Sequence, residues 1–215
     1  MIEAEKYRAV IFDLDGTLYD NKGLPLKLVL GDIRNMWKLA AERKARKAIK
    51  GIDFGDAAGV YDALFNKMAE VKKDLTPETA RRWYQDTYMP LQVAMIALYF
   101  PARPLVIELL EAMRARDIRI ILYSDYGHEA EKVEALGIPL SLFDGIVSAA
   151  KTGGLKPCRV SMERLAKQFE LDSDTTLYVG DREDTDGICA SVVGMQFYNV
   201  KSSKEAWDNL LKAFL

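Results

Sequence analysis

The chain has 215 residues, of which 49% are hydrophobic, and its formal net charge at pH 7 is −2. This length suits one large domain or two small ones with a sizeable core, and the small net charge argues against a general affinity for nucleic acid. The first five residues lack the basic and apolar regions of a signal peptide, and no apolar run reaches the ~18 residues of a membrane span. The two cysteines have no metal-ligand spacing around them. We therefore expect a cytoplasmic protein without a nucleic-acid or membrane partner.

A pair of carboxylates follows the first predicted strand. The apolar run over residues 9–12 leads directly into Asp13 and Asp15, with Gly16 and Thr17 after them. In an open α/β sheet, ligands bind beyond the carboxyl ends of the strands, and buried acids there need a partner or a metal. The segment is therefore a candidate catalytic centre, with a solvated acidic turn as the alternative.

A helical pattern extends over residues 20–100. Apolar residues at intervals of three and four predict one long amphipathic helix over residues 26–48 and a second over residues 60–75. A third helix is predicted to begin after Thr76 as its N-cap, with a kink or break at Pro90. We expect an all-helical unit inserted after the first strand.

From residue 101 onward, predicted strands alternate with predicted helices. These later strands span residues 118–123, 144–147, 176–179 and 196–200. Such alternation predicts a doubly wound parallel sheet with right-handed crossovers, whose strand ends share one edge. The fold would therefore bring Ser124, Lys156 and Asp181 into the same crevice as Asp13 and Asp15.

The residue types in this crevice favour phosphoryl transfer. Asp13, Asp15 and Asp181 would repel one another without a counter-charge, and their hard oxygen ligands suit Mg²⁺. Ser124 offers a hydrogen-bond donor, and Lys156 offers a positive charge for a phosphoryl group. In such a site, positioning and charge neutralisation supply most of the rate acceleration.

Four segments, in order along the chain, resemble the motifs of the haloacid dehalogenase (HAD) superfamily. They are Asp13-Leu14-Asp15-Gly16-Thr17 for motif I, Ser124 for motif II, Lys156-Pro157 for motif III and the segment from Gly180 to Asp186 for motif IV. The resemblance implies a Rossmann-like α/β core domain made of residues 1–19 and 101–215. It also implies that residues 20–100 form a helical cap domain of the C1 type.

The same resemblance implies a role for each motif residue. Asp13 would be the nucleophile that forms an aspartyl-phosphate, and Asp15 would protonate the leaving oxygen and then activate water. Mg²⁺ would be held by Asp13, by the backbone carbonyl of Asp15 and by Asp181. Asp186 would support the metal or its waters from the second shell. The transferring phosphoryl group would be bound by the residues of motifs II and III, Ser124 and Lys156.

Asp15 also separates activities within the superfamily. Dehalogenases that resemble this architecture lack an acid at that position and need no Mg²⁺, and the phosphonatase branch replaces it. The favoured function is therefore a Mg²⁺-dependent phosphatase that acts on a small phosphorylated metabolite. Two alternatives stay open, namely a sugar phosphomutase or other phosphotransferase, and a non-catalytic regulatory protein that binds a phosphometabolite. The sequence does not decide between a monomer and a homodimer.

Residues close to the motifs allow two interpretations each. Thr17, Tyr19 and Asp20 are candidates for the substrate pocket, although the last two could serve only as a hinge. Motif II is usually followed by asparagine, and here Asp125 follows it. Asp125 either shapes substrate preference or, as we favour, points away or caps the next helix. Residues 34–50 contain seven basic residues and one acid, which form either a solvated helix face, our favoured interpretation, or a surface that attracts an anionic substrate.

Overall fold

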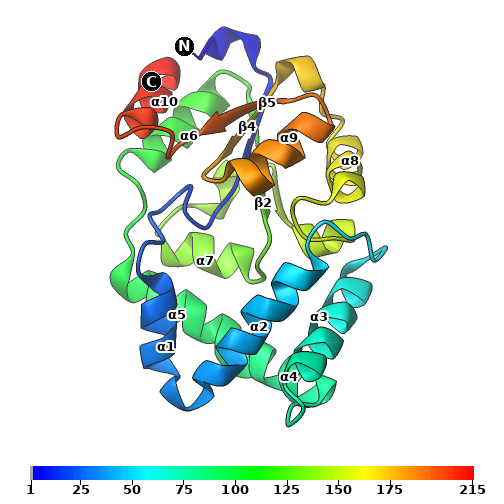
Figure 1. The fold of residues 1–215 in the computed structure, drawn as a ribbon. Coiled ribbons are helices and arrows are strands. Elements are labelled where there is room, and N and C mark those ends of the chain that lie inside the picture. Colours follow the sequence, from blue (N-terminus) through cyan, green and yellow to red (C-terminus); the bar gives the residue numbers. More distant parts are fainter. Residues whose placement is uncertain (1) are drawn as a thin grey trace.

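A five-stranded parallel sheet organises one half of the molecule (Figure 1). The structure is a computed structural model and describes residues 2–215. β1 is the central strand, and its four residues are apolar and buried, as expected for a strand covered on both faces. The strands, in spatial order, are β3 (Gly145–Ser148), β2 (Arg119–Ser124), β1 (Ala9–Phe12), β4 (Thr176–Gly180) and β5 (Gln196–Asn199). Every pairing is parallel, so the carboxyl ends of all five strands meet at one edge.

Helices cover both faces of this sheet. Alternate residues of β1 take part in two separate hydrophobic clusters, with Val10 and Phe12 in one and Ala9 and Ile11 in the other. The first cluster is closed by α6 (Val106–Ala115), α7 (Glu129–Ala135) and α10 (Ala206–Phe214). The second is closed by α8 (Arg159–Gln168) and α9 (Ile188–Val192). The alternation follows from the two-residue period of a strand.

A second layer, made only of helices, lies beyond the carboxyl edge of the sheet (Figure 1). It contains α1 (Leu24–Gly31), α2 (Met36–Ile49), α3 (Ala57–Val71), α4 (Pro77–Trp83) and α5 (Met89–Tyr99). Two chain segments connect it to the sheet, and they pair through an isolated bridge between Tyr19 and Ala102. Arg103 clamps the same junction by donating to the carbonyl oxygens of Thr17 and Gly16 at 2.7 and 3.2 Å. The predicted α/β fold with an inserted helical cap is confirmed, while its domain boundaries stay a prediction.

The prediction of one long helix over residues 26–48 is wrong. α1 ends at Gly31, and a short 3₁₀ turn separates it from α2. Gly31 packs against α5 so closely that a Cβ atom there would lie 2.9 Å from Leu91 Cδ1. Next to it, the Asp32 carboxylate accepts a hydrogen bond from Trp83 Nε1 at 3.1 Å. Tertiary contacts at this point therefore override a periodicity that continues through it.

The other helical predictions hold with shifted ends. α3 ends at Val71, so Leu75, predicted to belong to this helix, lies beyond its end. Thr76 is confirmed as the N-cap of α4, because its Oγ1 accepts from the backbone N–H of Thr79 at 3.2 Å. The break expected at Pro90 occurs just before it, where the chain forms a wide π-helical turn over Tyr84–Tyr88. Among residues 2–215, every helix is too short or too polar to cross a bilayer.

Candidate active site

Asp13 follows β1 directly and stands at the centre of a charged cluster. Its carboxylate accepts hydrogen bonds from Lys156 Nζ at 2.6 Å and from Thr17 Oγ1 at 3.0 Å. Burial raises the pKa of Asp13 to about 8, and the carboxylates of Asp186 and Asp181 add to the rise although Lys156 opposes it. Burial thus outweighs the stabilising charge of Lys156, and a further cation would favour the ionised form of Asp13.

Three carboxylates in this cluster could hold such a cation. Single oxygen atoms of Asp13, Asp181 and Asp186 all lie within 4.8 Å of one another. Gly16 is needed for this arrangement, because its φ of +104° is left-handed and a Cβ atom would lie 2.3 Å from Asp181 Oδ2. A hard, all-oxygen donor set of this kind fits Mg²⁺. The Asp186 carboxylate, expected only to support the metal, lies within the same cluster as the other two.

A second lysine, Lys201, lies beside Asp181. Lys201, which follows β5, places Nζ 2.7 Å from Asp181 Oδ2 and so offsets one of the three negative charges. The backbone carbonyl of Asp15, expected as a metal ligand, accepts a hydrogen bond from Asn21 Nδ2 at 2.9 Å. That hydrogen bond fixes the orientation of the carbonyl, which keeps a second lone pair.

Lys156 lies in the loop after β3 and forms ion pairs with two of the acids. Its ammonium lies 2.6 Å from Asp13 Oδ1 and 2.6 Å from Asp186 Oδ1, and the side chain is almost fully buried. Burial alone would lower the pKa of Lys156, but the two carboxylates raise it well above its ordinary value. The lysine therefore carries a permanent positive charge at the place where the sequence predicts phosphate binding.

Asp125 does not cap the following helix or point away, so the favoured interpretation of it is wrong. α7 begins three residues after Tyr126, and its N-cap residue is His128, without a capping side-chain hydrogen bond. The Asp125 carboxylate instead accepts from the backbone N–H of Lys156 at 2.7 Å and lies 3.6 Å from Nζ of Lys50, the residue directly after α2. Asp125 therefore connects motif II with motif III and with the helical layer. It also lines the site cavity.

The Asp15 carboxylate has its own set of donors, separate from those of Asp13. It accepts a hydrogen bond from the Tyr19 hydroxyl, and Lys132 Nζ lies 3.1 Å from its Oδ2. Ser124 Oγ approaches the same oxygen at 3.5 Å, the outer limit of a hydrogen bond. Lys132 is completely buried, and our sequence interpretation missed it. Its three- and four-residue spacing from Glu129 and Leu136 was the available signal, but a lysine at such a position usually extends to solvent.

The other three predicted pocket residues differ in burial. Thr17 and Tyr19 are buried and reach the site through the carboxylates that they bind, Asp13 and Asp15. Asp20 is exposed, and its carboxylate accepts from the backbone N–H of Lys22 at 3.0 Å. None of these three candidates lines the site cavity within residues 2–215.

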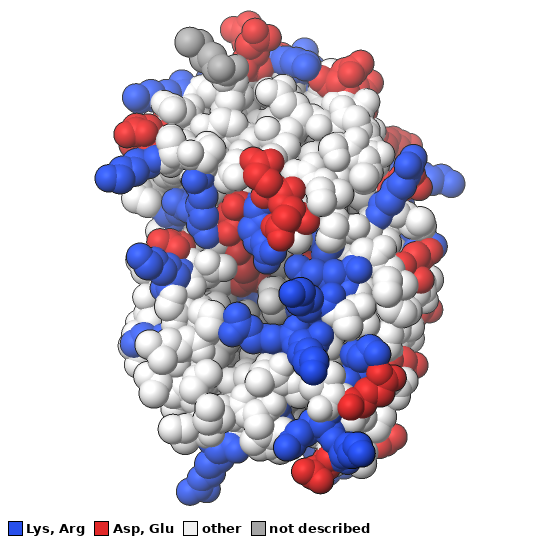
Figure 2. Space-filling view, viewed as in Figure 1, with Lys and Arg blue, Asp and Glu red and all other residues white. Residues whose placement is uncertain are grey.

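The basic segment of residues 34–50 is only partly a solvated face. Arg46 is buried, forms an ion pair of 2.6 Å with Glu42 and donates to the Asp125 carbonyl at 3.1 Å. Lys50 lines the site cavity itself. Figure 2 shows a hollow between core and cap, with acidic side chains on its core side and basic side chains gathered over α2. The solvated-face interpretation is therefore wrong for the residues of α2 that face the core.

The site cavity has a volume of about 110 Å³. Residues from all four predicted motifs line it, and they are Asp13, Asp15, Ser124, Lys156, Asp181 and Asp186. The structure thus brings together every candidate catalytic, phosphate-binding and metal-binding residue. A phosphoryl group in this cavity would be close to a nucleophilic carboxylate, an acid, a hydroxyl and a lysine.

A family comparison agrees with this arrangement. The family model for haloacid dehalogenase-like hydrolases matches residues 7–194. The chain belongs to this family. It is therefore a hydrolase of the HAD type, and the match includes all four motifs as well as the helical cap.

Solved structures of HAD-family members share the fold of this HAD-like hydrolase. A predicted phosphoglycolate phosphatase from Haemophilus somnus 129PT is 21% identical, with a TM-score of 0.60 over 90% of this chain and 85% of that chain. A HAD phosphatase from Thermococcus onnurineus is 20% identical, with a TM-score of 0.61 over 92% and 88%. An L-2-haloacid dehalogenase from Xanthobacter autotrophicus is 16% identical, with a TM-score of 0.59 over 97% and 84%. The search of curated proteins finds no match. At these identities the similarity demonstrates the fold, and it includes phosphatases as well as dehalogenases.

Proposed function

We propose that this HAD-like hydrolase is a Mg²⁺-dependent phosphatase that cleaves a small phosphate monoester through an aspartyl-phosphate. The observation that carries the proposal is the convergence of the Asp13, Asp181 and Asp186 carboxylates beside Asp15. Dehalogenases that resemble this architecture lack an acid at the position of Asp15. A site for attack on a halogenated carbon would also gain little from three clustered carboxylates.

Asp13, Asp181 and the Asp15 carbonyl would hold Mg²⁺, with Asp186 supporting it. When bound, the ion would neutralise the charge of the carboxylates and of the phosphoryl oxygens. Lys156 would bind a phosphoryl oxygen while it also orients Asp13, to which it is hydrogen-bonded at 2.6 Å. Ser124 would donate to a second oxygen from the end of β2.

The reaction then has two steps that use the two acids differently. In the first, an Asp13 oxygen attacks phosphorus, the bond from phosphorus to the alcohol oxygen breaks, and Asp15 gives its proton to that oxygen. In the second, Asp15 takes a proton from water, which attacks the aspartyl-phosphate and releases inorganic phosphate and the Asp13 carboxylate. Asp15 returns to its protonated form, so the cycle consumes one water molecule.

The test compares two reactions on the same protein. We expect release of inorganic phosphate from phenyl phosphate, a phosphate monoester, with Mg²⁺, above the rate without enzyme, and loss of this activity with EDTA. We expect no chloride release from 2-chloropropionate under either condition. Chloride release that persists in EDTA, or phosphate release that EDTA leaves unchanged, would contradict the proposal.

A further inference from the structure

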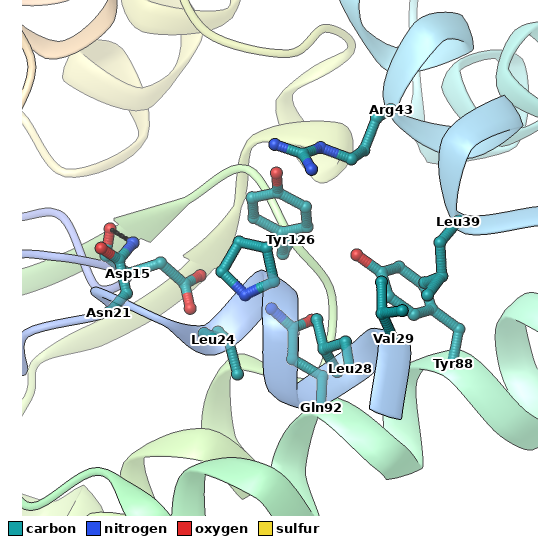
Figure 3. A pocket seen from close by; sticks show the side chains of 11 residues that line it. Asp15, Asn21, Leu24, Leu28, Val29, Leu39, Arg43, Tyr88, Gln92 and Tyr126 are labelled. Carbon is teal, nitrogen blue, oxygen red and sulfur yellow. Dashed lines mark hydrogen bonds between the residues drawn. The ribbon is translucent and has the colours of Figure 1, made fainter. Parts of the chain in front are cut away.

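A second cavity adjoins the site cavity on its cap side (Figure 3). It has a volume of about 160 Å³ and lies among α1, α2 and α5. Asp15, Asn21 and Tyr126 line both cavities, so the proposed proton donor stands at the boundary between them. If the phosphoryl group occupies the smaller cavity, the alcohol that Asp15 protonates has to occupy this one.

The volume of the second cavity indicates how much of the alcohol it can enclose. An engineered cavity of about 150 Å³ in another protein holds benzene, so this one accepts about six non-hydrogen atoms beyond the bridging oxygen. Its walls come from packed helices, and they are mainly apolar, with Leu24, Leu28 and Leu39 buried. A hexose or a nucleoside is much larger than this space, whereas a three-carbon alcohol fits.

Gln92 supplies a specific polar contact in this otherwise apolar cavity. It is 3% exposed on α5, and its Oε1 atom has no hydrogen-bond partner among residues 2–215. Figure 3 shows its side chain rising from α5 into the group of residues that line the cavity. A buried carbonyl oxygen without a partner is unfavourable, and a hydroxyl or amino group of a ligand would satisfy it.

Arg43 supplies a positive charge at the rim. It extends from α2 over the Tyr126 ring in Figure 3. It is exposed, and within the described chain its guanidinium makes no ion pair or hydrogen bond. Since guanidinium groups pair well with carboxylates, Arg43 suits an anionic group at the outer end of the ligand.

From these three features we propose that the alcohol released by this enzyme is a short hydroxy acid that carries an additional hydroxyl or amino group. About three carbon atoms fill the apolar space, the additional group donates to Gln92 Oε1, and the carboxylate pairs with Arg43. This inference rests on the proposed phosphatase function and adds the class of substrate to it.

The substrate test uses compounds that differ by one feature at a time. 3-Phosphoglycerate has both polar groups, glycerol 3-phosphate lacks the carboxylate, and 2-phosphoglycolate lacks the second hydroxyl. Glucose 6-phosphate and AMP exceed the volume. We expect kcat/KM for 3-phosphoglycerate to exceed that of each smaller analogue by about tenfold and that of the two large compounds by about 100-fold or more.

Two variants connect this preference to the cavity. Gln92→Leu should lower kcat/KM for 3-phosphoglycerate by about tenfold and for 2-phosphoglycolate much less, because only the first donates to Oε1. Its control is Gln85→Leu, an exposed glutamine on the turn before α5. Leu28→Ala should raise activity toward larger esters relative to 3-phosphoglycerate, and its control is Leu26→Ala, which is 62% exposed on the same helix.

The outcomes separate this inference from the function on which it rests. Equal kcat/KM for AMP and 3-phosphoglycerate would overturn it, as would a Gln92→Leu profile identical to that of Gln85→Leu. Absence of Mg²⁺-dependent phosphate release from every compound, phenyl phosphate included, would overturn the phosphatase proposal itself.

Discussion

The surroundings of Asp13 and Asp15 differ although only one residue separates them. Asp13 belongs to a dense charged cluster at the sheet edge, with Lys156, Asp181 and Asp186 contributed by core loops. Asp15 lies at the entrance to an apolar cavity whose walls come from cap helices. The core thus supplies the charged groups of the site, whereas the cap supplies most of the apolar walls beside it.

Each of the two acids also has a buried lysine of its own. Lys156 binds Asp13 at 2.6 Å from a loop, and Lys132 binds Asp15 at 3.1 Å from α7. Both lysines are buried and both ion pairs are shielded from water. Separate partners allow the two carboxylates to be held in different orientations and to take different roles.

The largest expected effect comes from Asp13→Asn, which tests the charged side of the comparison. An amide is a far weaker nucleophile than a carboxylate, so we expect kcat to fall by at least about 10⁴-fold. Lys156 keeps its contact with Asp186, so the fold should survive. Phosphate release and thermal unfolding measure the two quantities.

The matched control is Asp74→Asn, because Asp74 is 84% exposed in its side chain and remote from the site cavity. It should behave like the parent in both measurements. Turnover of Asp13→Asn at the parental rate would rule out Asp13 as the nucleophile.

A smaller effect is expected from Lys132→Met, which tests the Asp15 side. Methionine has a similar length but no charge, so Asp15 would keep Tyr19 and lose its ionic partner. We expect kcat to fall by about 10- to 100-fold, a range typical of residues that orient a functional group, with KM changing less. Steady-state kinetics on phenyl phosphate measures both parameters.

Lys167→Met on α8 is the control for this variant, because that lysine is exposed. Lys132→Arg should restore part of the loss in kcat, since it returns the charge. If Lys132→Met lowers only the unfolding temperature and leaves kcat unchanged, Lys132 is structural and does not position Asp15.

The smallest effect is expected from Glu129→Gln, one turn before Lys132 on α7. Glu129 is 7% exposed, and burial raises the pKa of Glu129 above its ordinary value. A carboxyl whose pKa is higher in the folded than in the unfolded state does not destabilise the protein at low pH, where it is protonated in both states. As the pH rises through the folded-state pKa, the folded protein becomes less stable. Glu129→Gln should therefore unfold a few degrees higher than the parent at pH 8 and equally at about pH 4.

Thermal unfolding from pH 4 to pH 8 measures this difference. The kcat of Glu129→Gln should stay close to that of the parent, because Glu129 does not line the site cavity and Lys132 forms its ion pair with Asp15. A loss of kcat as large as that of Lys132→Met would show that Lys132 serves both acids and would weaken the division between the two sides of the site.

The sequence predicted the charged side of the site well because its residues follow buried strands. Asp13, Ser124 and Asp181 each come at or directly after an apolar run, and parallel pairing places the ends of such runs at one edge. The HAD fold, the helical cap and the convergence of the motif residues follow from that pattern. Strand ends are a local feature of the chain, so they can be found without knowledge of packing.

The surroundings of Asp15 and the helical cap depended on contacts between residues that are distant in the sequence. Lys132 meets Asp15 across 117 positions of the chain, and Asp125 turns to Lys156 instead of capping the helix that follows it. The break at Gly31 and the unpaired oxygen of Gln92 likewise arise where α5 packs against its neighbours. The acids, the hydroxyl and the lysine that meet at the sheet edge could be predicted from the sequence. The helix faces that close over them could not, because the burial of a side chain depends on which distant surfaces meet there.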